Sequence, residues 1–254
     1  MATYKKRGGK PSTKTEKETS IEDGSTTAEV FNTLDESASR TEEWVIKNQK
    51  YIFIIVGLAA ALVLGYLGFD KFVQEPKQSI ATNDMFQSQQ YFDQAVNGAS
   101  KDSLFTLALN GADGKYGFLD IADVYSGTDA GNLANYYAGV SYLQMKQYDK
   151  AIEFLSKFNS DDEMLGPVAL GAIGDAFSDI DQQNDALEYY EKAANKKSNE
   201  FTTPMFLFKA GQTAMSLEKY SKAEQLFAQI KENYSKSDQA KDIEKFINAA
   251  KYAK

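Results

Sequence analysis

The sequence predicts an all-α protein in which a single transmembrane helix is followed by an α-solenoid of about three helical hairpins and a C-terminal capping helix. Three observations support this fold class. An uncharged apolar stretch of 19 residues, 51–69, follows a polar N-terminal segment. Small and aromatic residues then recur at intervals of 35 and 37 residues. The final segment, 237–253, carries apolar side chains at helical spacing.

The N-terminal 50 residues divide into two parts. Residues 1–26 are rich in Lys, Thr, Ser, Glu and Gly and contain almost no large apolar side chain. Such a segment cannot bury enough surface to fold, so we expect a disordered cytoplasmic tail. In residues 27–50 apolar side chains recur at three- and four-residue spacing, which predicts an amphipathic juxtamembrane helix along the inner membrane surface.

Residues 51–69, YIFIIVGLAAALVLGYLGF, are predicted to cross a membrane once. A helix of this length spans about 28 Å, close to the hydrocarbon thickness of a bilayer. Fifty polar residues precede it, so it is a permanent signal anchor and not a cleaved signal. The alternative is a buried core helix, which would need partner surfaces all round it.

The distribution of charge predicts the orientation of the anchor. Arg40, Lys47 and Lys50 precede it closely, and further Lys and Arg residues lie near the N-terminus. On the other side only Lys71 and Lys77 are close. This bias favours a cytoplasmic N-terminus and an exported C-terminal part, although the reverse orientation, with cytoplasmic repeats, stays open.

The exported part carries the whole net charge of -8, because the first 50 residues contain nine basic and nine acidic side chains. An acidic domain repels nucleic acid, and also anionic lipid beyond the anchor itself, so neither is an expected partner for it.

Small residues recur on one face of the anchor. They let two helix backbones approach closely, which makes this stripe a candidate helix-packing surface. The alternative is that glycine and alanine are simply common in membrane helices. The stripe comprises Gly57, Ala61, Gly65 and Gly68.

Residues 70–131 are predicted to form a helical lead-in. Pro76 is expected to interrupt any continuous helix, and Gln78–Asn97 to resume one. Its inward face is predicted to carry Ala81, Met85, Phe92 and Val96. Residues 110–117, NGADGKYG, predict a plain turn, since they lack the ligand pattern of a phosphate or calcium loop. A short helix over residues 118–125 follows.

Three segments align with one another in residues 132–233. We expect the small positions to lie where the two helices of a unit cross and the aromatic positions to fill the space beside them. A final helix over 237–253, with Ala240, Ile243, Phe246, Ile247 and Ala250 facing inward, would cap the stack. The aligned positions are Gly139, Gly174 and Gly211; Tyr142, Phe177 and Ala214; Ala151, Ala186 and Ala223; and Leu155, Tyr190 and Phe227.

These units resemble tetratricopeptide repeats, whose helix-turn-helix period is about 34 residues. The resemblance covers residues 132–254, repeats and capping helix together. It implies a concave surface, on the first helix of each unit, that binds extended or helical peptide. Several of these positions are equally well explained as packing or solvated residues. By position, the surface comprises Tyr136, Val140 and Gln144, then Asp175, Ser178 and Asp179, then Phe208, Gln212 and Met215. It forms an acidic patch flanked by aromatic and thioether side chains, which suits unfolded or basic-apolar segments.

The chain contains neither histidine nor cysteine. Ser-His-Asp and Cys-His nucleophile systems are therefore excluded, and zinc lacks its preferred ligands. Paired carboxylates or a Ser-Lys dyad remain chemically available, but the acidic residues follow the spacing of solvated helix faces. We expect no enzyme activity, no metal and no cofactor.

The complete layout resembles the YfgM-type ancillary subunits of the bacterial SecYEG translocon, in the form found in Bacteroidota. The segments NQKYIFIIVGL and LALNGADGKYGFLDIADVYSGTDAGNLANYYAG carry the resemblance. It implies a single-pass protein of the bacterial inner membrane with periplasmic repeats. It also implies as partners the Sec translocon subunits, a membrane-anchored prolyl isomerase or chaperone, and nascent secretory polypeptides. The alternative function is a membrane-tethered scaffold for another cell-envelope or secretion complex.

Overall fold

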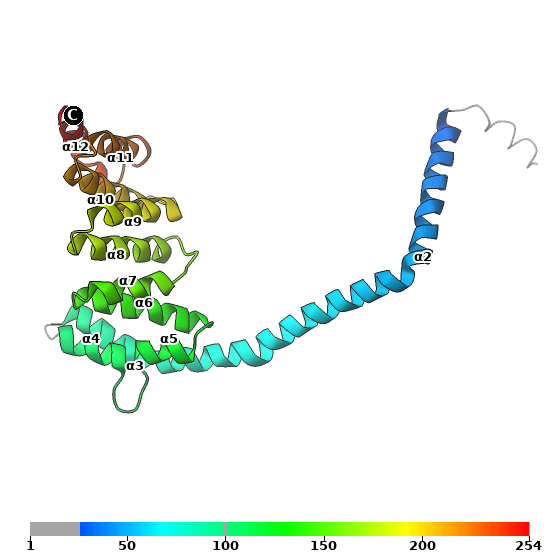
Figure 1. Ribbon diagram of the computed structural model, residues 1–254, viewed down its shortest axis with the longest axis horizontal. Helices are drawn as coiled ribbons and strands as arrows, with labels where there is room; N and C mark the ends of the chain where they lie inside the picture. The colour runs from blue at the N-terminus through cyan, green and yellow to red at the C-terminus, as the bar shows by residue number, and fades with distance from the viewer. Residues whose placement is uncertain (1–25, 99–100, 254) are drawn as a thin grey trace, which may run out of the picture. The chain divides into compact units, whose positions relative to one another are not determined.

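The computed structural model describes residues 26–98 and 101–253, and these are helical with no β-strand (Figure 1). The predicted disordered tail lies almost entirely outside the described residues. The chain divides into two compact units, residues 1–69 and 70–254. The all-α class predicted from the sequence is confirmed.

The first unit contains one helix, α2 (Thr26–Phe69). The segments predicted as a juxtamembrane helix and a membrane span thus form one continuous α-helix. In the described residues one helical stretch is long and apolar enough to cross a membrane, with a mean hydropathy of 2.5 over its most apolar part. None of that part is buried in the chain, which argues against the alternative of a buried core helix.

The expected interruption at Pro76 is wrong. A five-residue π-helix, η1 (Asp70–Gln74), is followed directly by α3 (Glu75–Asn97), with Pro76 in the first turn of α3. A proline inside an α-helix clashes with the carbonyl four residues earlier and lacks an N–H donor. Because a π-helix widens the turn before the proline, the helix continues where the sequence suggested a break.

The lead-in is built from α3, α4 (Lys101–Asn110) and α5 (Phe118–Val124). The loop between α4 and α5 is the predicted turn, and the hydroxyl of Ser88 donates to the Tyr116 carbonyl at 2.7 Å to hold it. Helix α4 has no counterpart in the sequence prediction. Phe118 and Ile121 of α5 are fully buried.

The inward face of α3 differs by one residue from the prediction. Ala81 and Met85 are buried and Phe92 packs on the same core, as expected. Val96, however, is 49% exposed, and Ala95 takes the buried position. The hydroxyl of Tyr125 donates to Asp84 of α3 and, together with burial, this bond raises the pKa of Tyr125 to about 12.

The solenoid consists of three helical hairpins that stack in chain order (Figure 1). Unit one is α6 (Asp129–Gln144) and α7 (Tyr148–Lys157). Unit two is α8 (Leu165–Asp179) and α9 (Gln183–Lys196), and unit three is α10 (Thr202–Ser216) and α11 (Tyr220–Asn233).

The aligned glycines lie where the paired helices cross, as predicted. A Cβ on Gly174 would come within 2.7 Å of the Tyr190 ring, and a Cβ on Gly211 within 2.4 Å of the Phe227 ring. In unit one, a Cβ on Gly139 would meet Leu155 at 2.5 Å. Each glycine therefore faces the large residue that follows it by 16 positions, and the helices can approach only because the side chain is missing.

The turn inside each hairpin has the same unpredicted backbone. Lys146, Asp181 and Glu218 adopt left-handed conformations with φ of 58°, 61° and 58°. The residue after each donates its N–H to a carbonyl five residues earlier, as in Gln147 to Tyr142 at 2.8 Å. This is the hydrogen-bond pattern of a Schellman helix end, where glycine is the usual residue.

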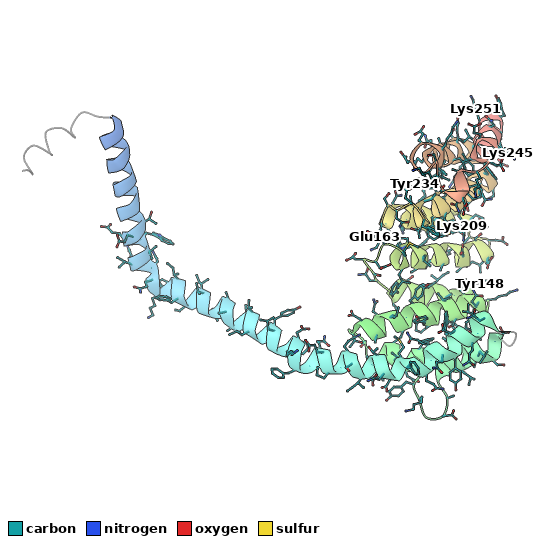
Figure 2. All side chains as sticks on the ribbon, turned by 180° about the vertical axis from the view of Figure 1, so that it is seen from behind. Tyr148, Glu163, Lys209, Tyr234, Lys245 and Lys251 are labelled. Carbon is teal, nitrogen blue, oxygen red and sulfur yellow. The ribbon has the colours of Figure 1, made fainter. Side chains whose placement is uncertain are left out.

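Asx side chains start the first helices of units two and three. The carboxylate of Asp162 accepts from the N–H groups of Met164 and Leu165, and Asn199 accepts from Phe201 and Thr202. The Asn199 amide also donates to the Glu163 carbonyl at 2.8 Å, which joins the two loops. Glu163 lies on the same edge of the stack as Tyr234 in Figure 2.

The C-terminal cap is shorter than predicted. A 3₁₀ turn, η2 (Asp238–Ala240), precedes α12 (Ile243–Tyr252), and Asp242 between them is left-handed with φ of 62°. The predicted inward residues do pack on unit three: Ile243 and Ala250 are buried, and Ala240, Phe246 and Ile247 contact the same core.

We expect Gly211→Ala to lower the free energy of unfolding of the solenoid by about 1–2 kcal/mol. Overpacking of the Phe227 site outweighs the helix propensity gained with alanine. Urea unfolding followed by circular dichroism measures the effect. Adding Phe227→Leu should recover part of the loss, whereas Gly65→Ala, with no atom within 4 Å of the new Cβ, should leave solenoid unfolding unchanged.

We expect Lys146→Gly to stabilise the solenoid by about 0.5–1 kcal/mol. A residue with a Cβ is destabilised by about 1–2 kcal/mol in the left-handed region, and glycine avoids this steric cost. Glycine loses more conformational entropy on folding, which offsets part of the gain. Lys146→Ala is the matched control, because it shortens the side chain and keeps the strain. Equal stability of the two variants would contradict this account of the turn.

Candidate partner-binding groove

A groove lies between the first helices of units two and three. Its volume is about 490 Å³. Helix α10 supplies four of the seven lining residues, α9 supplies two and α8 supplies one. Hydroxyl and amide groups dominate its surface, so it is suited to hydrogen bonding more than to apolar burial. The lining residues are Ser178, Gln183, Tyr190, Lys209, Gln212, Thr213 and Ser216.

One carboxylate organises the charge beside this groove. The Lys209 ammonium donates to Asp175 at 2.6 Å, and the Tyr190 hydroxyl donates to the same oxygen at 2.7 Å. The Lys209 nitrogen also lies 5.5 Å from the centre of the Tyr190 ring. Burial and then the bond to Asp175 raise the pKa of Tyr190 above its ordinary value, so the phenol stays neutral and acts as a donor.

The three residues predicted for the concave surface of unit one differ in exposure. Tyr136 and Val140 are half-buried and pack on the cluster around Leu155. The ring of Tyr136 lies 5.2 Å from that of Phe158. Gln144 is exposed. In unit one, therefore, only the last of the three presents its full side chain to solvent.

In unit two, Ser178 lines the groove and Asp175 lies beside it in the ion pair with Lys209. Asp179 is exposed and hydrogen-bonds to the side chain of Tyr148 in unit one. Figure 2 labels both Tyr148 and Lys209 on the stack. The sequence suggested an acidic patch here, but Lys209 offsets the charge of one of its two carboxylates.

Of the three residues predicted for the concave surface of unit three, only Gln212 lines the groove. The ring of Phe208 lies 4.8 Å from Phe246 of the capping helix and 5.8 Å from Phe227. Met215 packs on the same core and is half-buried. The aromatic group expected to flank the binding surface thus contacts the capping helix, and the thioether group packs on the core of unit three.

Sequence reasoning missed most of the polar lining. Lys209 stands 34 residues after Asp175, which is about one repeat. Opposite charges at that separation were the available sign of an ion pair between neighbouring units. Tyr190 was recognised only as a packing residue, yet its hydroxyl reaches the groove side of Asp175. Gln183, Thr213 and Ser216 carry no signal that distinguishes them from ordinary surface residues.

A larger cavity of about 710 Å³ lies at the loop edge of unit three, between the start of α10 and η2. Exposed Phe201 is at this site, together with polar loop residues such as Asn233 and Asp238. It involves a single repeat and the cap, whereas the groove between α8 and α10 joins two repeats. Within residues 41–98 and 102–253, His, Cys, Asp and Glu side chains form no group of three that would hold a metal.

Comparison with known proteins supports the repeat assignment. A tetratricopeptide repeat model matches residues 133–161 and 206–237, which correspond to units one and three. No curated protein matches the sequence. A crystal structure from Podosopora anserina, described as a kinesin light chain with nearly identical TPR-like repeats, aligns with a TM-score of 0.48 and 12% identity, over 66% of this chain and 84% of that one.

The matched segments and the repeated geometry lead to one structural conclusion. Unit two lies between the two matched segments and has the same crossing glycine, left-handed turn and buried alanine as its neighbours. The solenoid of this protein is therefore built from tetratricopeptide-like repeats.

Proposed function

We propose that this protein is a single-pass protein of the bacterial inner membrane whose periplasmic repeats bind partner proteins beside the Sec translocon. Tetratricopeptide-like repeats are protein-interaction scaffolds, and the family model that matches this chain is a tetratricopeptide repeat. The observation that carries the proposal is the combination of an exposed apolar helix with a repeat solenoid that leaves a polar groove open between two units. In this role the chain acts without catalysis.

The groove favours an extended polypeptide as the bound species. Backbone amides of such a segment present alternating donors and acceptors, and the Ser178, Gln183 and Gln212 side chains can supply both. The internal ion pair of Asp175 with Lys209 leaves little net charge at the site. Recognition of this kind suits emerging chains of varied sequence, which is the chaperone-like part of the proposal.

The anchor offers a second contact. A Cβ on Gly57, Gly65 or Gly68 would meet no atom of the described chain within 4 Å, so no described part of the protein covers these positions. We propose that this stripe, with Ala61, packs on a helix of the translocon or of a membrane-anchored prolyl isomerase or chaperone.

The second candidate function is a scaffold for another cell-envelope or secretion complex. The same solenoid and anchor serve it equally well, and the identity of the partners separates the two. The closed packing of Phe208 against the cap favours neither.

Co-purification from native membranes in mild detergent tests the proposal. We expect translocon subunits to be recovered with a C-terminally tagged chain, and the repeats to be digested by protease only after the outer membrane is opened. Envelope-assembly proteins without the translocon would establish the scaffold function instead. Repeats digested only after the inner membrane is opened would overturn the orientation.

A groove variant tests where partners bind. Gln212→Arg places a long cation between α8 and α10 and should weaken partner binding about tenfold, or by about 1.4 kcal/mol. Gln229→Arg on α11 is the matched control, since Gln229 is exposed and lies outside the groove. Equal binding of both variants, measured by quantitative co-purification, would exclude the groove as the contact.

A further inference from the structure

The first helix after the anchor has an apolar stripe on the side that does not contact the solenoid. Phe72 is 80% exposed, Val73 48% and Ile80 54%, and exposed Pro76 lies between them at helical spacing. None of these residues belongs to a core cluster of the solenoid. These four residues form what we call the α3 stripe.

The opposite side of the same segment is fully engaged by the solenoid. Gln78 accepts the Ala130 N–H at 3.3 Å, and Ala81 and Met85 are buried in the core with α5 and α6. Ser88 holds the Tyr116 loop. Because these contacts fix how the helix is rotated, the α3 stripe is held on the outside of the domain.

The charged groups near the stripe are paired or turned away from it. Lys71 forms an ion pair with Glu75 at 2.7 Å, so the two charges offset each other. The Lys77 ammonium reaches the Ser126 carbonyl of the solenoid at 3.4 Å. The stripe itself therefore presents only aromatic and aliphatic groups.

The stripe ends abruptly along the helix. After Ile80, the residues at the same spacing are amides: Asn83, Gln87, Gln90 and Gln94. The apolar part thus begins three residues after the end of the predicted span and stops 11 residues after it. Exposed Phe86 and Val96 lie farther along α3 but off this line, so the unbroken apolar stripe is confined to the start of a helix that reaches Asn97.

We infer that the α3 stripe lies in the interfacial layer of the periplasmic leaflet of the inner membrane. This inference rests on the proposed membrane anchor. Eleven residues of helix extend about 16 Å, whereas the interfacial layer on each side of the hydrocarbon is only about 5–8 Å thick. Ile80 would stand in water if the helix continued upright, so the inference requires the helix axis to turn at the π-helix η1 toward the membrane plane.

The occupant of the stripe is therefore lipid. Aromatic and aliphatic side chains next to a span are typical of residues that settle at the level of the headgroups. Contact along Phe72–Ile80 would hold this part of α3 against the membrane.

Site-specific probes in the full chain test this inference. The protein has no cysteine, so each single-cysteine variant carries one attachment site for an environment-sensitive fluorophore. Ile80→Cys and Phe72→Cys report on the stripe. Thr82→Cys is the matched control, because Thr82 is exposed on the same helix but off the stripe, and Leu62→Cys reports on the span itself.

In liposomes that contain brominated phospholipid, we expect quenching by lipid to be several-fold stronger at residues 72 and 80 than at residue 82. Quenching by aqueous iodide should show the reverse order. If the probe at residue 80 is quenched to the same extent as the probe at residue 82, the inference is overturned. If lipid still quenches the probe at residue 62 in that case, the proposed anchor is retained. A probe at residue 80 shielded from both quenchers would also overturn the inference, because a protein would then cover the stripe.

Loss of lipid quenching at residue 62 has a different meaning. It would show that the apolar helix does not enter the bilayer, so the anchor and the stripe would fail together. Circular dichroism of each labelled variant confirms that the helices are retained, and the high exposure of Phe72 and Ile80 makes their replacement compatible with folding.

Discussion

The close approach of the two helices in each hairpin is the constraint on which the solenoid depends. At Gly174 and Gly211 the partner helix places an aromatic ring where any larger residue would have its Cβ. This contact sets the distance between the paired helices and therefore the angle at which the next unit packs. Alanines at 151, 186 and 223, all fully buried, keep the second helices equally close to their neighbours.

The features that depend on side-chain volume were predictable from the sequence. Gly139, Ala151 and Leu155 have counterparts of similar type in the later units, because the two helices of every repeat pack in the same way. The inward residues of the cap follow from a simple helical period. The continuous helix at Pro76 could not be predicted in the same way. The rule that proline interrupts a helix does not take account of a π-helix in the preceding turn, which accommodates the proline ring. Ala95 and Val96 lie about equally far from the centre of the buried face of an ideal helix, so spacing alone could not decide between them.

The candidate groove was predictable only in part. Of the positions predicted for the concave surface, Ser178 and Gln212 line the groove. It could not reveal that Phe208 packs on Phe246, because that contact comes from a helix outside the repeats. The pairing of Asp175 with Lys209 and Tyr190 likewise depends on how two units meet, which a single-repeat pattern does not contain. Polar networks between units depend on how neighbouring units pack on one another, and the residue pattern within one repeat does not specify that packing.

The capping helix has a consequence for the timing of partner binding. In a linear array each unit contacts only its neighbours, so fraying begins at the ends and moves inward. Helix α10 lines the groove, and its Phe208 also contacts Phe246 of α12, which packs mainly on α11. Detachment of α12 would therefore loosen one wall of the groove while α8, held between its neighbours, stayed in place. The structural stability of the groove thus depends on the packing of a ten-residue helix that does not itself line the groove.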